Sequence, residues 1–159
     1  MKKLFIISIS VFILTNFCHA SDTSTVSVRA TVVSRGYCQF DTSTSALNFG
    51  NLDPSNPRDI TATTTITYRC FRWFIFPVTF FIGDDDGLYE IGPNKNRMRH
   101  HTILTEFIPY SFDLNPTSGT IMGNWASHTL TLTGSIRGPD YENAATGRYT
   151  DTVTITIIP

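Results

Sequence analysis

Residues 59–70 read DITATTTITYRC, a run in which apolar side chains alternate with threonines and which ends in a cysteine. Alternation with a period of two places successive side chains on opposite faces of an extended chain, so this run predicts a β-strand with one buried face. Its β-branched residues favour the same conformation. The run therefore sets the expectation for the whole chain, which is an all-β domain.

Further strands are predicted on both sides of this run, at residues 46–50, 74–82, 108–114, 129–136 and 149–158. No window of ten or more residues keeps a helical period, and ten glycines and eight prolines punctuate the chain. Six or seven strands in a chain of this length predict a β-sandwich of the immunoglobulin-like type. In the last strand, alternation predicts inward-facing side chains at Val153, Ile155 and Ile157.

The stretch at 74–82 differs from the others because it is almost continuously aromatic and aliphatic. Such a run favours a strand that is covered on both faces. Pro77 interrupts the run, and a proline favours an edge position or a bulge.

The first twenty residues have the layout of a secretory signal peptide. Lys2 and Lys3 precede an apolar run over residues 4–14, and a polar stretch then ends at the small residue Ala20. The apolar run is too short to span a membrane stably. We therefore expect residues 1–20 to be removed on export and the mature chain to start at Ser21.

The mature chain has ten basic and thirteen acidic residues, a net charge of about −3. This balance does not indicate binding to nucleic acid or to an acidic membrane surface. Its 139 residues suit one domain.

Two cysteines remain after the predicted cleavage, Cys38 and Cys70. An even number of cysteines in an exported chain predicts a disulfide. A two-cysteine metal site would need histidine or carboxylate partners at ligand spacing, and neither cysteine has such a neighbour in the sequence.

Catalytic and metal-binding motifs find no support in the sequence. His100 and His101 are adjacent, so on a strand they would point to opposite faces, and we expect both to be exposed to solvent. Residues 84–87 read DDDG, like the start of a calcium loop, but no glutamate follows at the twelfth position, so a solvated turn is predicted. The chain has no nucleophile-elbow or phosphate-binding glycine motif. We expect no enzyme activity, no cofactor, no metal and no small-molecule substrate.

The N-terminal segment of the mature chain has two interpretations. Residues 25–33 alternate cleanly, and the strand at 149–158 is predicted to lack a partner beyond it. The segment can be the first strand of its own sheet, or it can add to the free edge of a neighbouring molecule through main-chain hydrogen bonds. The pattern alone leaves both open. The apolar face of the segment carries Val26, Val28, Ala30 and Val32.

Six motifs, in order, carry a family resemblance. They are the alternating segment leading to Cys38, Leu47-Asn48-Phe49-Gly50, the strand end Ile66-Thr67-Tyr68-Arg69-Cys70, a basic turn at Asn96-Arg97-Met98, Pro109-Tyr110-Ser111-Phe112, and the closing run GRYTDTVTI at residues 147–155. Together they resemble the spore coat protein U domain, the subunit domain of archaic, Csu-type chaperone–usher pili. The closing run is the most specific of the six.

The resemblance implies an incomplete immunoglobulin-like sandwich that lacks its last strand. In such families a periplasmic chaperone lends a strand to the open groove, and at an outer-membrane usher the next subunit's N-terminal segment replaces it. Residues 21–35 would then be the donor segment, with Val26, Val28, Ala30 and Val32 as donor side chains, and residues 36–159 the pilin domain. The implied protein is a structural subunit of a surface fibre in adhesion and biofilm formation, exported to the periplasm and assembled outside the cell. Its implied partners are the chaperone, the usher and neighbouring subunits.

Two features depart from the family pattern, the unusually aromatic stretch at 71–81 and the charge of Arg29 inside the donor segment. Two other functions stay open. The chain could be a free-standing secreted β-sandwich that binds a ligand, such as a sugar, through Trp73, Phe74 and Phe76. It could also be a structural protein of a spore coat.

Overall fold

The computed structural model describes residue 29 and residues 36–159. The predicted donor side chains Val26, Val28, Ala30 and Val32 lie outside the described residues, as does the predicted signal peptide. Within the described part of the chain, no helix is long and apolar enough to cross a membrane. The strands are β1 (Tyr37–Phe40), β2 (Ile60–Phe71), β3 (Pro77–Asp84), β4 (Asn96–His100), β5 (Phe107–Asn115), β6 (Ser118–Met122), β7 (Asn124–Ile136), β8 (Tyr149–Thr150) and β9 (Ile155–Ile158). Two short 3₁₀ helices are η1 (Trp73–Ile75) and η2 (Gly138–Asp140).

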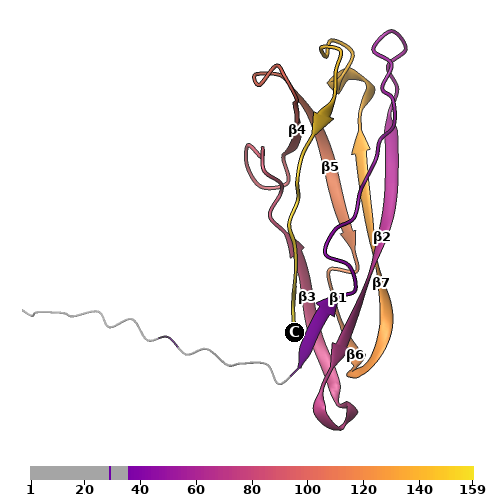
Figure 1. Ribbon diagram of the computed structural model, residues 1–159, viewed down its shortest axis with the longest axis vertical. Coiled ribbons are helices and arrows are strands. Elements are labelled where there is room, and N and C mark those ends of the chain that lie inside the picture. The colour runs from indigo at the N-terminus through magenta and orange to yellow at the C-terminus, as the bar shows by residue number, and fades with distance from the viewer. Residues whose placement is uncertain (1–28, 30–35) are drawn as a thin grey trace, which may run out of the picture. The chain divides into compact units, whose positions relative to one another are not determined.

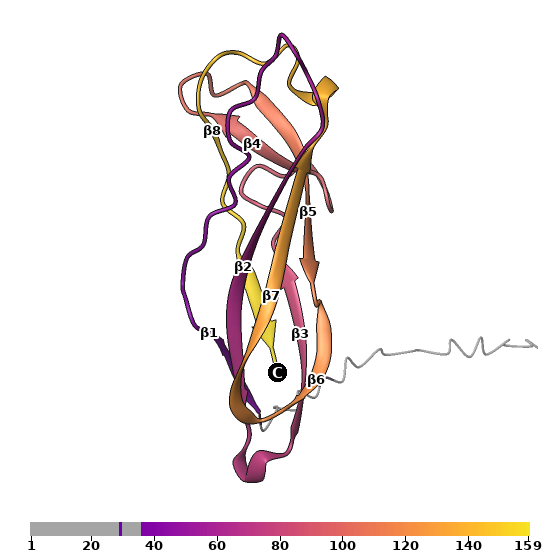
Figure 2. The same ribbon diagram turned by 90° about the vertical axis from the view of Figure 1, so that its right-hand side faces the viewer.

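The strands form two sheets, and every strand pair is antiparallel (Figures 1 and 2). The larger sheet has six strands in the order β1-β2-β7-β5-β4-β8, and the smaller has three in the order β6-β3-β9. Their inner faces pack against each other, so the predicted all-β sandwich is confirmed. The two longest strands, β2 and β7, pair with each other in the larger sheet, with Ile66 opposite Leu130.

Two clusters of buried side chains form the core. In the first, Tyr68 of β2 lies against Phe80 of β3 with ring centroids 5.2 Å apart, which joins the two sheets. The second lies toward the other end of β7 and contains Ile108 and Tyr110 of β5, Ile136 of β7 and Tyr141. Both clusters follow from alternation, because every second residue of these strands faces inward.

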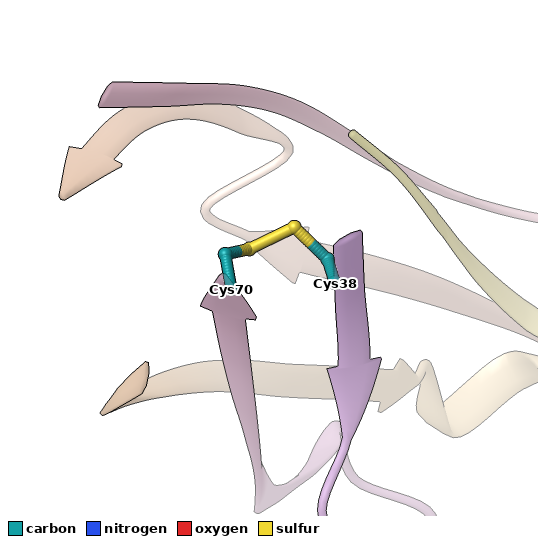
Figure 3. Close-up of a disulfide and its surroundings, with 2 residues drawn as sticks. All are labelled: Cys38 and Cys70. Carbon is teal, nitrogen blue, oxygen red and sulfur yellow. A yellow bond between two sulfur atoms is a disulfide. The ribbon is translucent and has the colours of Figure 1, made fainter. Parts of the chain in front are cut away.

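A disulfide joins β1 to β2 between Cys38 and Cys70, and the two cysteines are also directly opposite in the strand ladder (Figure 3). Both residues are buried in the first core cluster. The bond closes a loop in which the cysteines are 32 positions apart, and it ties the first strand of the domain to the end of the second.

Removing this bond with Cys38→Ser and Cys70→Ser should lower the free energy of unfolding by roughly 3–4 kcal/mol, because the unfolded chain regains the entropy of the closed loop. Chemical denaturation of the purified mature protein, with and without reductant, measures this difference. In the unmodified protein, mass spectrometry should detect no free thiol. Two free thiols, or an unfolding curve that is insensitive to reductant, would contradict the expectation.

Two predicted strands and one predicted turn differ from the structure. Residues 46–50 carry no strand, although they lie against the sheet. The long C-terminal strand is split into β8 and β9, because residues 151–154 leave the ladder. The predicted basic turn at residues 96–98 lies instead in β4, which pairs with β5 and β8.

The aromatic stretch was predicted to be covered on both faces, and this is wrong. Only one face of β3 is buried, and residues 73–76, which precede the strand, are exposed. Pro77 neither occupies an edge strand nor forms a bulge: it is the first residue of β3, the central strand of the smaller sheet. A proline is tolerated at a first position in a strand.

The prediction that both histidines are exposed is wrong for His100, whose side chain is only 3 % exposed. Its Nδ1 accepts hydrogen bonds from the backbone N–H groups of Thr102 and Ile103, and its Nε2 lies 3.2 Å from the carbonyl oxygen of Thr146. The ring packs edge-on against Tyr149 at 4.9 Å. His100 therefore holds two loops together, whereas His101 is exposed as predicted.

Candidate functional site

A groove of about 1250 Å³ opens between two stretches of chain that do not pair with each other. One wall is the stretch after β1, residues 42–54, and the other is the stretch leading into β9, residues 144–155. Figures 1 and 2 show these two stretches, purple and yellow, running along the same side of the sandwich. The floor is made of inward-facing residues of β2, β4, β5 and β7, namely Ile66, Met98, Ile108, Tyr110, Phe112 and Leu132.

The strands beside the groove are edge strands. Within residues 36–159, β1 pairs only with β2, at one edge of the larger sheet, and β9 pairs only with β3, at one edge of the smaller sheet. An edge strand presents unpaired N–H and C=O groups that can pair with another strand. Phe40 at the end of β1 and Ile155 at the start of β9 line the groove, so a free strand edge reaches it on either side of its apolar floor, an arrangement suited to binding an extended apolar segment.

The first wall is held to the floor by Leu47 and Phe49, which lie over Gly134 near the C-terminal end of β7. A Cβ atom at position 134 would stand 2.6 Å from Leu47 Cδ2 and 2.7 Å from Phe49 Cζ, so any larger residue would displace this wall. Phe49 also contacts Tyr110 edge-on, with ring centroids 6.0 Å apart. These contacts explain why Leu47 and Phe49 face inward without a strand ladder.

The second wall is anchored by Asp151. Its Oδ2 accepts a hydrogen bond from the Tyr110 hydroxyl at 2.7 Å, and its Oδ1 accepts from the backbone N–H groups of Leu88 and Thr152. Burial, together with the neighbouring Asp151 carboxylate, raises the pKa of Tyr110, so the phenol stays protonated and keeps donating. Asp151 thus interrupts the C-terminal strand and fixes it to the floor.

The acidic loop beside this wall uses its carboxylates as acceptors for backbone groups. Asp85 Oδ1 accepts from the N–H groups of Gly87 and Thr154, and Asp86 Oδ1 accepts from that of Asn94. Burial alone would raise the pKa of Asp85, but the hydrogen bonds from Thr154 and Gly87 outweigh it and lower the pKa below its ordinary value. No group of three or more histidine, cysteine or acidic side chains that could hold a metal ion occurs in the part of the chain that the structure describes.

The predicted site residues fall in two places. Cys38 and Cys70 form the disulfide described above. The predicted inward-facing side chains of the last strand are half-buried: Val153 packs against the second core cluster, and Ile155 and Ile157 pack against the first. Val153 and Ile155 also line the groove.

The contacts of Gly134 and Asp151, which position the two walls, were not identified from the sequence. Two signals were present: Gly134 interrupts an otherwise β-branched and aliphatic strand, and Asp151 places a charge in an alternating one. Neither signal indicates on its own which distant residue it contacts, because Gly134 faces residues 47–49 and Asp151 contacts Tyr110.

Residues 22–156 match the family model described as the Spore Coat Protein U domain. No curated protein matches. Among solved structures, one chain reported as "Chaperone-tip adhesin complex is vital for synergistic activation of CFA/I fimbriae biogenesis" aligns with 12 % sequence identity and a TM-score of 0.49. The alignment covers 77 % of the present chain and 42 % of that chain, so the present chain spans less than half of its length.

Proposed function

The chain belongs to the spore coat protein U domain family, and on that basis we propose that it is a structural subunit of a surface pilus that polymerises by exchanging strands between subunits. Residues 21–35 are the donor segment, and the groove between residues 42–54 and 144–155 is the acceptor. The subunit acts in adhesion and biofilm formation, and it has no catalytic role. It is exported to the periplasm and ends as part of a fibre outside the cell.

The observation that carries this proposal is the apolar floor of the groove. Met98 and Phe112 of the floor and Val153 and Ile155 of the second wall line the groove and are only partly buried, whereas Ile66 and Leu132 beneath them belong to the core. Covering such side chains contributes about 25 cal/mol for each Å² of apolar surface removed from water. A strand laid between the two walls would gain this energy and would also find free edges for its backbone.

Residues 21–35 have the pattern that this groove requires. In an extended chain Val26, Val28, Ala30 and Val32 share one face, and burying one valine contributes about 1.5–3 kcal/mol. Arg29 lies between Val28 and Ala30, so it belongs to the opposite face and points away from the floor. The charge in the donor segment is therefore compatible with donation.

The open groove also supports the other two proposed partners, a periplasmic chaperone and an outer-membrane usher. A subunit whose groove leaves apolar side chains partly exposed needs a temporary occupant, which a periplasmic chaperone provides by lending a strand. The exchange of that strand for the donor segment of the next subunit takes place at an outer-membrane usher.

A peptide with the sequence of residues 21–35 tests the proposal directly. The domain of residues 36–159 is refolded with this peptide, with a scrambled peptide of equal composition, or alone. We expect stable folded protein and peptide co-elution only with the native order, because binding to the folded state adds about 2.7 kcal/mol of stability at a ligand concentration 100 times Kd. A domain that is equally stable alone, or that does not distinguish the two peptides, contradicts the proposal.

A further inference from the structure

Eight exposed apolar side chains gather at the end of the sandwich where β1 begins, and we name this set the aromatic pole. The most exposed are Trp73 at 70 % and Phe74 at 80 %. The set comprises Tyr37, Phe71, Trp73, Phe74, Ile75, Phe76, Met122 and Trp125. An exposed apolar cluster of this kind marks an interaction surface in a soluble domain.

Ring contacts join the members of the aromatic pole. Trp125 stacks on Tyr37 with centroids 6.2 Å apart and meets Phe71 edge-on at 6.3 Å. Phe74 contacts Trp73 at 5.9 Å and Phe76 at 6.4 Å, in both cases edge-on. Residues from β1, β2, η1 and the start of β7 thus contribute to it.

The aromatic pole carries little charge. Arg72 is the one charged residue in the sequence 71–81, and its guanidinium lies 5.6 Å from the centre of the Phe76 ring while donating a hydrogen bond to the carbonyl of Pro77. The positive group is therefore folded back onto the domain. The surface that remains favours an apolar partner over a charged one.

The backbone under the aromatic pole is strained. Phe74, Ile75 and Trp125 have φ angles of 61°, 57° and 64°, a left-handed conformation that is uncommon for bulky residues. Asparagine or glycine adopts it at lower cost. Large apolar residues at strained and exposed positions lower the stability of the isolated domain, so they indicate a surface used for binding.

The position of the aromatic pole identifies its partner. The last predicted donor side chain, Val32, is five residues before Tyr37, which is itself part of the pole. Five residues span at most about 18 Å when fully extended. A neighbouring subunit whose groove holds residues 21–35 must therefore lie directly beside the aromatic pole.

We propose that the aromatic pole is a second contact between subunits and packs against the copy of this chain that receives residues 21–35. This inference rests on the proposed function. It adds a surface contact to the strand exchange, and the short connection makes the two contacts act on the same pair of subunits.

The test uses the mature chain with Phe74→Asn and Ile75→Asn. Asparagine tolerates the left-handed backbone and both side chains are exposed, so the fold should persist with an unchanged or higher melting temperature. The matched control is Leu88→Asn and Ile91→Asn, which are also exposed but lie beyond the opposite end of the eight-residue strand β3. Two quantities are measured, the association of mature chains by analytical ultracentrifugation and the binding of the 21–35 peptide to the groove.

We expect association to weaken at least about tenfold in the pole variant, since two contact residues at the centre of an interface are lost, while peptide binding stays unchanged. The control should alter neither quantity. Unchanged association of the pole variant overturns the inference alone. Loss of peptide binding in the pole variant also overturns it, because residues 21–35 would then dock on the pole. Absence of peptide binding to the unmodified groove overturns the proposed function and this inference together.

Discussion

A mature chain carrying Val28→Asp is expected to lose fibre assembly completely while its own domain stays folded. In the proposed arrangement Val28 enters the apolar groove of a neighbour, where an unpaired carboxylate would lose its hydration without gaining a partner. The domain of residues 36–159 does not contain this side chain, so the melting temperature of the chaperone-bound subunit should not change. Assembly is followed by light scattering and electron microscopy after chaperone-bound subunits are mixed.

Ser27→Asp is the matched control, because it places the same charge one position earlier and therefore on the opposite face of the extended segment. The control variant should assemble at a rate close to that of the unmodified chain. Normal assembly of Val28→Asp would contradict strand donation by this segment. Unfolding of the chaperone-bound Val28→Asp subunit, under conditions in which the chaperone-bound unmodified subunit stays folded, would instead show that residues 25–33 are the first strand of their own sheet.

Phe80→Ala should have the largest effect on stability, with a loss of about 3–5 kcal/mol in the free energy of unfolding. The side chain is 1 % exposed and packs against Tyr68 between the two sheets, so its removal leaves a cavity in the core. Phe81→Ala is the control, because the adjacent side chain points to the outer face of β3 and is 61 % exposed. The control should cost less than about 1 kcal/mol.

Urea denaturation followed by circular dichroism measures both variants. If the two substitutions cost similar amounts, the faces of β3 are assigned incorrectly. A larger cost for Phe81→Ala would mean that its outer face is covered in solution by another molecule, and this can be checked from the concentration dependence of the melting temperature.

Regular alternation made β2, β5 and β7 predictable. In residues 59–70, for example, the apolar residues Ile66 and Tyr68 face inward and alternate with threonines that do not. The physical basis is local, since a strand with one face buried must show period two whatever its partner is. The family resemblance rests on six motifs, of which one lies in β2 and one in β5, and the match of residues 22–156 to the family model confirms the family.

The errors concern residues whose environment is created by distant parts of the chain. His100 is buried because Tyr149 and the carbonyl of Thr146 lie over it, and its own neighbours in sequence give no sign of this. The C-terminal strand breaks at Asp151 because its carboxylate bonds to Tyr110, about forty residues away. Alternation describes which face a side chain takes, but not which side chains from elsewhere meet it.

The aromatic stretch shows a different kind of ambiguity. Residues 74–76 were assigned to a fully covered strand because apolar runs usually lie in a core. The structure instead exposes them at the aromatic pole. A sequence cannot distinguish these two cases when the same residue types serve burial within the domain and burial against another molecule.

The disulfide has a mechanical consequence if the protein works in a fibre. Tension along the fibre would enter each subunit through the residues before Tyr37 and would reach Cys38 directly after it. Cys38 is covalently bonded to Cys70 at the end of the long strand β2. A pulling force is therefore passed by the covalent bond to β2, which is paired on both sides within the larger sheet, and β1 cannot be peeled from β2 one hydrogen bond at a time. The 31 residues between the two cysteines are shielded from extension, so the force needed to lengthen a subunit depends on oxidation.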